Sequence, residues 1–267
     1  MLPCPVCDAV MQPAFTAAVL YRHQAHYDHC SACGYLRARA PHWLDEAYAD
    51  AIAITDTGLL QRNQVLARQL TALFGLLGTS RDAHFLDFAG GYGVLTRLMR
   101  DAGFDFHWSD KYSRNLLATG FEFNPGLAPC RAVTAFEVLE HVEDPRGFVA
   151  EALAASGADI MVFSTQTYDG PPPPRDWWYY AFETGQHIGF FRPDTLARLG
   201  QSLGLHFQSY RGVHMFSRVP QSRWRFRLAV GRLASLLAFV IRRRRGPLTD
   251  SDHRLMIQRL ADRADQL

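Results

Sequence analysis

The stretch DFAGGYG, Asp87 to Gly93, decides the fold of this 267-residue chain. It ends the apolar run HFLDFA and opens the helical stretch VLTRLMRDAG, so it is a glycine-rich turn between an expected strand and an expected helix. Such a turn lets a ligand approach the backbone, and the start of the helix offers free N–H groups. We therefore expect a ligand at this turn. The pattern D-x-A-G-G-x-G differs from the dinucleotide pattern G-x-G-x-x-G.

Strand-like and helical runs alternate on either side of this turn. An amphipathic helix is expected at 59–77, and the later runs are DFHWSD, AVTAFEV, PRGFVAEALAAS and IMVFSTQT. This alternation predicts a doubly wound α/β fold, with a parallel sheet covered by helices on both faces. Ligands of such sheets bind beyond the carboxyl ends of the strands. Asp110 ends the second strand, where an acid commonly accepts hydrogen bonds from a ribose diol, a role compatible with capping a helix.

FLDFAGGYG, Asp110 and AFEVLEHVEDP together resemble the class I S-adenosylmethionine-dependent methyltransferases, over about residues 60–218. The resemblance implies a mostly parallel seven-stranded sheet whose last two strands form a hairpin, LHFQSYR and HMFSRV. Ala89 stands where the family usually has its first glycine. The segment 111–131 is too short for a full helix before the third strand, for which FEF at 121–123 is the candidate. The cofactor-binding residues implied are Asp87, Ala89, Gly90, Gly91, Gly93, Asp110 and Phe136.

Two CxxC pairs lie near the N-terminus, Cys4 with Cys7 and Cys30 with Cys33. Two such turns can point four thiolates at one tetrahedral ion, which predicts a closed structural Zn²⁺ site in a small zinc ribbon. A redox CxxC is the alternative, and it normally needs only one pair. Cys130 stands alone and is expected to be a small buried residue.

Acidic and imidazole groups follow the expected fourth strand in AFEVLEHVEDP. Glu137, Glu140 and His141 lie there, and His187 follows the fifth strand just before a helix that opens at RPDTL. Two carboxylates beside an imidazole favour a cation between them, and these donors suit a divalent ion with open positions, Mg²⁺ or Mn²⁺. The alternative is a structural role, in which Glu140 caps and His141 packs. E-x-x-E-H with a distant histidine resembles the metal site of small-RNA 3′-end 2′-O-methyltransferases, and its first half resembles ubiquinone-pathway O-methyltransferases.

The segment 168–190 contains a proline run and four aromatic residues, which indicates a lid. Its pattern WWYY…GQHI resembles that of glycan-cluster methyltransferases, which favours a saccharide or another small molecule as substrate. Arg175 is the one phosphate contact that this lid offers, which disfavours nucleic acid. The aromatic plates expected to stack on substrate are Trp177, Trp178, Tyr179 and Tyr180.

The C-terminal stretch WRFRLAVGRLASLLAFVIRRRRG has an apolar run flanked by arginines, too short to span a bilayer. It either packs on its own domain or a second subunit, or lies as a peripheral helix in a membrane interface. The sequence opens without a secretory pattern, and we expect a cytoplasmic protein, peripheral to a membrane if that helix binds one. The oligomeric state cannot be read from the sequence.

These observations predict a methyltransferase that acts on a hydroxyl of a saccharide or diol, with two alternatives. One is a sugar C-methyltransferase with His141 or His187 as base, and the other is an inactive adaptor with a zinc ribbon. The expected divisions are a zinc ribbon at 1–40, a helical lead-in at 41–80, a cofactor-binding domain at 81–219 and C-terminal helices at 220–267.

Overall fold

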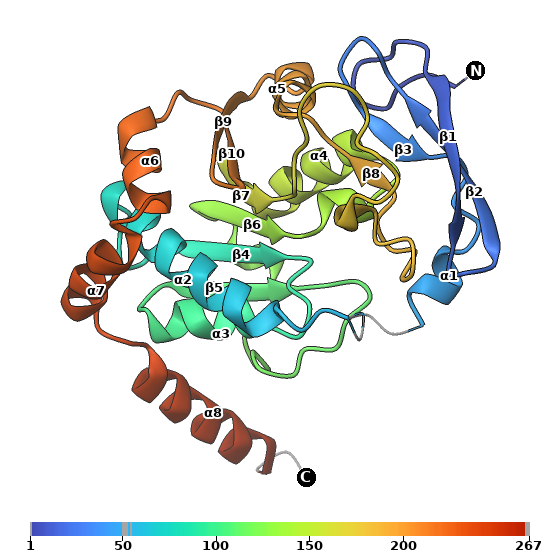
Figure 1. Cartoon of the computed structure of the whole chain (residues 1–267). Coiled ribbons are helices and arrows are strands. Elements are labelled where there is room, and N and C mark those ends of the chain that lie inside the picture. The colour runs from blue at the N-terminus through green and yellow to red at the C-terminus, as the bar shows by residue number, and fades with distance from the viewer. Residues whose placement is uncertain (1, 50–52, 54, 265–267) are drawn as a thin grey trace. The chain divides into compact units, whose positions relative to one another are not determined.

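The computed structural model describes residues 2–49, 53 and 55–264 (Figure 1). The chain forms two compact units. The first unit contains Met1–Asp56 and Thr134–Gln221, and the second contains Thr57–Val133 and Ser222–Leu267. In this division the N-terminal segment groups with the second half of the larger sheet.

The first unit contains a four-stranded sheet in the order β1-β2-β3-β8, and each neighbouring pair is antiparallel. In β2 the buried Ala25 and Tyr27 alternate with the exposed Gln24 and His26, the two-residue period of a half-buried strand. The last strand comes from far along the chain, and Figure 1 shows it beside β3. The elements of this part are β1 (Gln12–Val19), β2 (His23–His29), β3 (Leu36–Ala38), α1 (Leu44–Ala47) and β8 (Gly189–Phe190).

The rest of the first unit follows the predicted alternation of strands and helices. β7 is buried at all five positions, as expected for a strand inside a sheet. Asp144 caps α4 by accepting a hydrogen bond from the Gly147 N–H at 2.9 Å, and Pro145 occupies the first helical turn. The elements are β6 (Ala132–Phe136), η2 (Leu139–His141), α4 (Pro145–Ser156), β7 (Ile160–Ser164), η3 (Trp178–Tyr180), α5 (Pro193–Ser202), β9 (His206–Tyr210) and β10 (Val213–Ser217).

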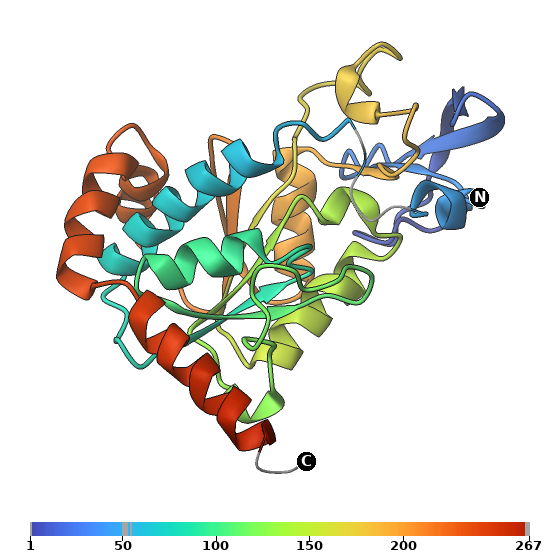
Figure 2. The ribbon, with the colours of Figure 1, turned by 90° about the horizontal axis from the view of Figure 1, so that it is seen from below.

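The second unit holds the glycine turn between β4 and α3. The expected helix at 59–77 is present as α2, and α3, α6 and α7 pack against it (Figure 2). α8 is fastened by Asp252, whose carboxylate accepts hydrogen bonds from Arg100 Nε and Nη2 at 2.9 and 2.8 Å. The elements are α2 (Leu59–Leu76), β4 (His84–Phe88), α3 (Val94–Asp101), β5 (Asp105–Ser109), η1 (Pro125–Leu127), α6 (Arg223–Val230), α7 (Ala234–Arg245) and α8 (Thr249–Ala264).

The larger sheet has the order β5-β4-β6-β7-β10-β9, and the division between the units falls inside β6. β4 and β5 are parallel, whereas β10 is antiparallel to β7 and β9, so the expected final hairpin is confirmed and the sheet is mixed. The described residues give this sheet six strands instead of seven. The candidate third strand at 121–123 makes a single parallel bridge, between Glu122 and Trp108, because the chain leaves the edge of β5 after one pair.

Candidate functional site

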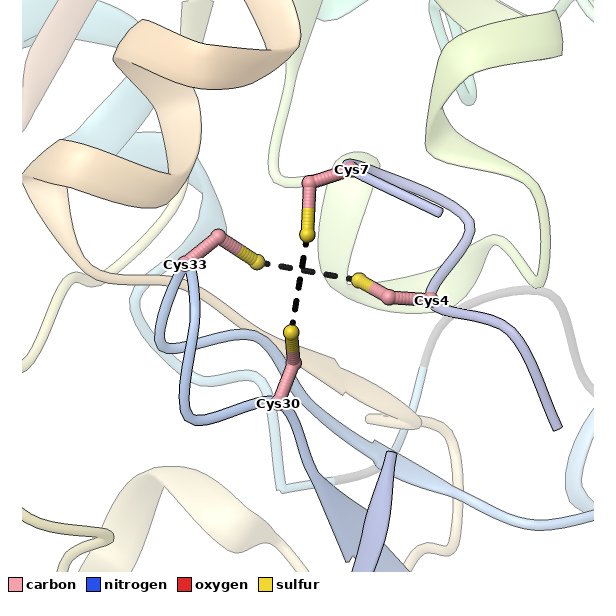
Figure 3. A group of neighbouring side chains, drawn as sticks. All are labelled: Cys4, Cys7, Cys30 and Cys33. Carbon is pink, nitrogen blue, oxygen red and sulfur yellow. Dashed lines mark hydrogen bonds between the residues drawn. The ribbon is translucent and has the colours of Figure 1, made fainter. Parts of the chain in front are cut away.

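The four cysteines converge on one point (Figure 3). Cys4 and Cys33 have their sulfur atoms 3.6 Å apart, and those of Cys7 and Cys30 are 3.5 Å apart. These separations exclude disulfide bonds, in which the S–S distance is about 2 Å. They are close to the roughly 3.8 Å edge of a tetrahedron whose corners lie about 2.3 Å from a zinc ion. The donor set therefore fits a structural Zn²⁺ ion.

The cysteine turns are fastened to residues from the second half of the first unit. The Cys33 carbonyl accepts a hydrogen bond from Thr195 Oγ1 at 2.6 Å, and the Gly34 carbonyl accepts one from the Tyr168 hydroxyl. Arg146 donates to the Val6 carbonyl at 2.8 Å. The zinc ribbon is thus an integral part of this unit.

The glycine turn lies in the second unit and is open where a ligand would approach. Gly91 has φ +55°, and a Cβ there would meet no atom within 4 Å. Gly93 has φ +82°, and a Cβ there would come within 3.0 Å of Ala118 Cβ and Asn115 Oδ1. Gly91 therefore leaves room beside the backbone for a ligand. Gly93 must be glycine, both because of its positive φ and because a side chain would not fit.

Ala89 and Asp87 explain how this turn is held. Ala89 adopts φ +58° at the position where the family usually has glycine, so an alanine bears a left-handed conformation that glycine adopts freely. Asp87 is buried, and its Oδ2 accepts a hydrogen bond from Thr96 Oγ1 of α3 at 3.0 Å. Its carboxylate therefore ties the end of β4 to the helix after the turn.

Asp110 follows β5 and is bonded to the same turn. Its Oδ2 accepts the Gly91 N–H at 2.9 Å, and its Oδ1 accepts the N–H groups of Tyr112 and Ser113, both at 2.7 Å. A carboxylate has about four lone-pair sites, so these three bonds leave room for a further donor such as a sugar hydroxyl.

The first unit contains a second group of donors. One ligand atom each from Glu140, His141 and His187 lies within 4.8 Å of the others. Glu140 is fully buried; its Oε1 accepts a hydrogen bond from the Tyr179 hydroxyl at 2.7 Å, and no described atom partners its Oε2. A buried carboxylate oxygen without a donor is costly, which indicates a missing positive partner.

The two histidines are held by backbone carbonyls. His141 Nδ1 lies 3.0 Å from the Gln186 oxygen, and His187 Nδ1 lies 2.7 Å from the Tyr179 oxygen. A carbonyl only accepts, so Nδ1 carries the proton in each ring and Nε2 keeps its lone pair. Burial and, to a smaller extent, the neighbouring His187 lower the pKa of His141 to about 3, so its ring is neutral.

Glu137 lies outside this group of three. Its Oε1 accepts a hydrogen bond from the Ser164 hydroxyl, and its N–H donates to the same hydroxyl at 3.1 Å. Its φ of +55° is the left-handed conformation that a non-glycine residue rarely adopts. Phe136, just before it, is half-buried at the last position of β6.

Three of the four lid aromatics pack inside the first unit. Tyr179 and Tyr180 are 2% and 1% exposed, and Trp177 packs against the same hydrophobic cluster. Burial and the charge of Glu140 raise the pKa of Tyr179 well above its ordinary value, so its hydroxyl remains a donor. Trp178 is 71% exposed and is the most exposed of the four.

Sequence reasoning missed several residues that hold this second group. Tyr48 places its hydroxyl 2.8 Å from His141 Nδ1, and nothing in the sequence around it signals this role. Gln186 donates to the Ala47 carbonyl at 2.8 Å while its own carbonyl holds His141. Gln186 directly precedes His187 in the sequence, and this position is the signal by which it could have been found.

A third group of donors lies at the start of β4 and β5 and was also not expected. Asp105 Oδ2 accepts a hydrogen bond from His84 Nδ1 at 2.7 Å, and His107 Nε2 lies 3.2 Å from Asp105 Oδ1. Arg100 also pairs with this carboxylate. The arginine already compensates the negative charge, so this group is an ion-pair network.

A mixed sheet with a glycine turn after one strand and an acid after its neighbour is the arrangement expected of a class I S-adenosylmethionine-dependent methyltransferase. The chain belongs to the family described as methyltransferase domain, whose model matches residues 59–210. The fold expected from the sequence is therefore confirmed. Among curated proteins, none matches the chain.

Several solved structures are distantly similar to this chain. TnmH is 17% identical with a TM-score of 0.45, over 66% of this chain and 60% of that one. The small RNA methyltransferase HEN1 is 16% identical with a TM-score of 0.41, over 64% of this chain and 27% of that one. Magnesium protoporphyrin IX methyltransferase ChlM from Synechocystis PCC 6803, with bound SAM, is 14% identical with a TM-score of 0.38, over 66% of this chain and 91% of that one. The chain thus spans less than two thirds of TnmH and HEN1, and likenesses this weak carry no information about substrate.

The residues of the second unit fit the cofactor of this class. The open backbone at Gly91 leaves space for a ligand, and Asp110 keeps lone pairs for a sugar hydroxyl. The start of α3 adds N–H groups that are free of helical partners.

Proposed function

We propose that this methyltransferase transfers a methyl group to a hydroxyl of a saccharide or another small molecule with adjacent hydroxyls, assisted by a divalent cation. The observation that carries the proposal is the convergence of Glu140, His141 and His187, which bring one ligand atom each within 4.8 Å of one another, beside a Glu140 Oε2 that no described atom partners. We assign cofactor binding to the glycine turn and Asp110.

The contacts around each donor support a metal site. Metal-binding histidines usually donate their other N–H to a carbonyl or carboxylate, which fixes the tautomer, and both histidines here do so. Tyr179 contributes twice, because its hydroxyl holds Glu140 and its carbonyl holds His187. Side chains fixed in this way need little rearrangement to bind an ion.

The donor set also indicates which cation fits. Two imidazole nitrogens and one carboxylate oxygen suit Mn²⁺ and other transition ions better than Mg²⁺, which prefers oxygen ligands. Three protein ligands leave open positions for substrate oxygens. A bound divalent ion would act as a Lewis acid on a hydroxyl, and bound S-adenosylmethionine would supply the methyl group from a sulfonium centre.

Trp178 supports a saccharide as the acceptor. It is exposed and adjoins Tyr179 in the chain, with the two rings 5.3 Å apart in an edge contact. An aromatic plate on the same segment as a metal-site residue can stack on the apolar face of a sugar. Trp177, Tyr179 and Tyr180 support the segment from inside the unit.

The first experiment incubates zinc-loaded protein with labelled S-adenosylmethionine and a panel of saccharides and diols, each paired with its singly deoxygenated analogue. We expect label transfer only where adjacent hydroxyls are present, and a product methylated on oxygen. Transfer to carbon would establish the C-methyltransferase alternative. Methylation of the deoxygenated analogues at equal rates would overturn the requirement for a diol.

The second experiment removes the weakly held cation with a chelator while zinc content is monitored. We expect methyl transfer to stop, to return with Mn²⁺, and to be absent in His187→Ala at any Mn²⁺ concentration. His253→Ala, a variant of an exposed histidine in α8, is the matched control and should behave as wild type. Full activity after chelation would show that a histidine acts without metal.

A further inference from the structure

The second unit carries a surface, formed by α6 and α7, that combines positive charge with exposed apolar side chains. Between Ser222 and Leu248 the chain has no acidic residue, although its net charge overall is only +2. The arginines of this stretch are Arg223, Arg225, Arg227, Arg232, Arg242, Arg243, Arg244 and Arg245.

Large apolar side chains stand among these arginines. Trp224 of α6 is 63% exposed. On α7 and just before it, Leu233, Leu236 and Val240 recur at three- and four-residue spacing and are exposed by 50%, 61% and 40%, and Phe239 beside them is exposed by 54%. This spacing places them along one side of the helix.

The opposite side of α7 is already occupied. Ala234 and Ala238 are buried, and a Cβ on Gly75 of α2 would lie 2.3 Å from Ile241 Cδ1, so the two helices are in close contact. Arg245 also points inward, donating to the carbonyls of Gly103 and Thr79 at 2.9 and 3.0 Å. The helix therefore cannot rotate to bury its exposed side in its own unit. Packing on its own domain, one of the three expected placements, accounts for only this inner side.

We propose that α6 and α7 form a docking surface for an anionic lipid membrane. Clustered arginines are attracted to acidic headgroups, and exposed Leu, Phe and Trp side chains gain free energy by entering the boundary between headgroups and acyl chains. The Arg243 guanidinium lies 4.5 Å from the centre of the Phe239 ring, which lets the ring enter an apolar layer while the charge stays among headgroups.

The combination of arginines with exposed apolar side chains favours a membrane over other anionic partners. A nucleic acid would use the arginines but would gain nothing from Leu236 and Val240. The surface lies along the membrane and does not cross it. No described helix is both long and apolar enough for a membrane span.

The test is flotation of the full-length, zinc-loaded protein with vesicles of phosphatidylcholine alone or mixed with phosphatidylglycerol. We expect binding to the anionic vesicles, weakening as salt is raised, and little binding to the neutral ones. The double variant Leu236→Glu/Phe239→Glu should lose about tenfold or more of the binding, because two apolar anchors become acidic. Arg243→Glu should also weaken it, because an arginine of the surface becomes acidic.

The matched control is Ile257→Glu/Leu260→Glu, which changes two side chains of α8 that are exposed by 54% and 62%. It should bind like wild type, and S-adenosylmethionine binding should verify that every variant is folded. Equal binding to neutral and anionic vesicles, or equal binding by both double variants, would overturn the proposal. So would a wild-type dimer in sedimentation that Leu236→Glu/Phe239→Glu converts to a monomer, since the surface would then join two copies of the chain.

Discussion

The hydroxyl of Tyr48 lies 2.8 Å from His141 Nδ1. Tyr48 directly follows α1 in the N-terminal segment that carries the cysteines, and His141 ends η2 after β6. Trp43 and Ala47 of the same segment bond the loop before His187, through the Gly185 carbonyl at 2.8 Å and the Gln186 side chain. The segment that carries the cysteines thus helps to build the acid–histidine group of the first unit, formed by Glu140, His141 and His187.

Tyr48→Phe tests this connection. Removing the hydroxyl leaves His141 held by the Gln186 carbonyl alone, so the ring is less firmly oriented. We expect Mn²⁺ affinity to fall by about tenfold, typical of an outer contact of a metal ligand, with unchanged S-adenosylmethionine affinity. The measurement is titration of both ligands, with Tyr21→Phe, which changes an 87% exposed tyrosine, as control. Equal Mn²⁺ affinity in the two variants would assign Tyr48 no role at the site.

Loss of one zinc ligand should abolish metal binding in the first unit and leave cofactor binding in the second unit intact. We expect one zinc ion per wild-type chain and none in Cys30→Ser, because three thiolates bind zinc far less tightly. S-adenosylmethionine binding should survive, since Gly91 and Asp110 lie in the other unit, while Mn²⁺ binding is lost. The control is Cys130→Ser, which removes the cysteine outside the cluster and should keep its zinc. Retention of Mn²⁺ binding in Cys30→Ser would show that the ribbon does not support the site.

Gly91→Ala and Gly78→Ala form a matched pair. Both glycines have positive φ, +55° and +66°, and at neither would a Cβ meet an atom within 4 Å. Each substitution should therefore destabilise the fold by a similar amount, about 1 kcal/mol. Only Gly91→Ala should also weaken S-adenosylmethionine binding, because its methyl group occupies the approach to the turn. Calorimetry that found equal affinity in both variants would place the cofactor elsewhere.

Protonation of His214 should make the stability of the first unit depend on pH. Burial lowers its pKa to about 4, and its ring is held between Ser209 and the Thr165 carbonyl. As pH falls from about 6.5 to 4, the unfolded chain binds a proton there before the native one does, so up to about 3 kcal/mol of stability is lost. That contribution is fully present above pH 6.5. Urea unfolding between pH 7 and 4 should show a smaller decline in His214→Gln, and an identical decline would exclude His214 as the source.

The parts of the molecule that could be predicted are those determined by residues close together in the sequence. The spacing of the cysteines, the strand–turn–helix at Asp87–Gly93 and the final hairpin each depend on neighbours in the chain, and the structure has all three. The candidate third strand became a single bridge at Glu122, because pairing at a sheet edge depends on where the loop after Asp110 leads.

The acid–histidine group was only partly predictable. Its three donors carry a recognisable pattern, but their supports at Tyr48 and Gln186 come from distant segments. Glu137 looked equivalent to Glu140 in sequence, yet a left-handed backbone turns its carboxylate to Ser164. Which of two nearby acids meets the histidines depends on backbone conformation, which the residue pattern does not specify.

The most direct test of the proposed metal site is Mn²⁺ binding followed by electron paramagnetic resonance on zinc-loaded protein, which requires no acceptor. We predict one tight site per wild-type chain, kept in His253→Ala and weakened by about 10²-fold or more in His187→Ala, where a ligand is lost. Zinc content must be equal in all three samples. Absence of a tight Mn²⁺ site in the wild type, or the same site in His187→Ala, would contradict the proposal that Glu140, His141 and His187 hold a divalent cation.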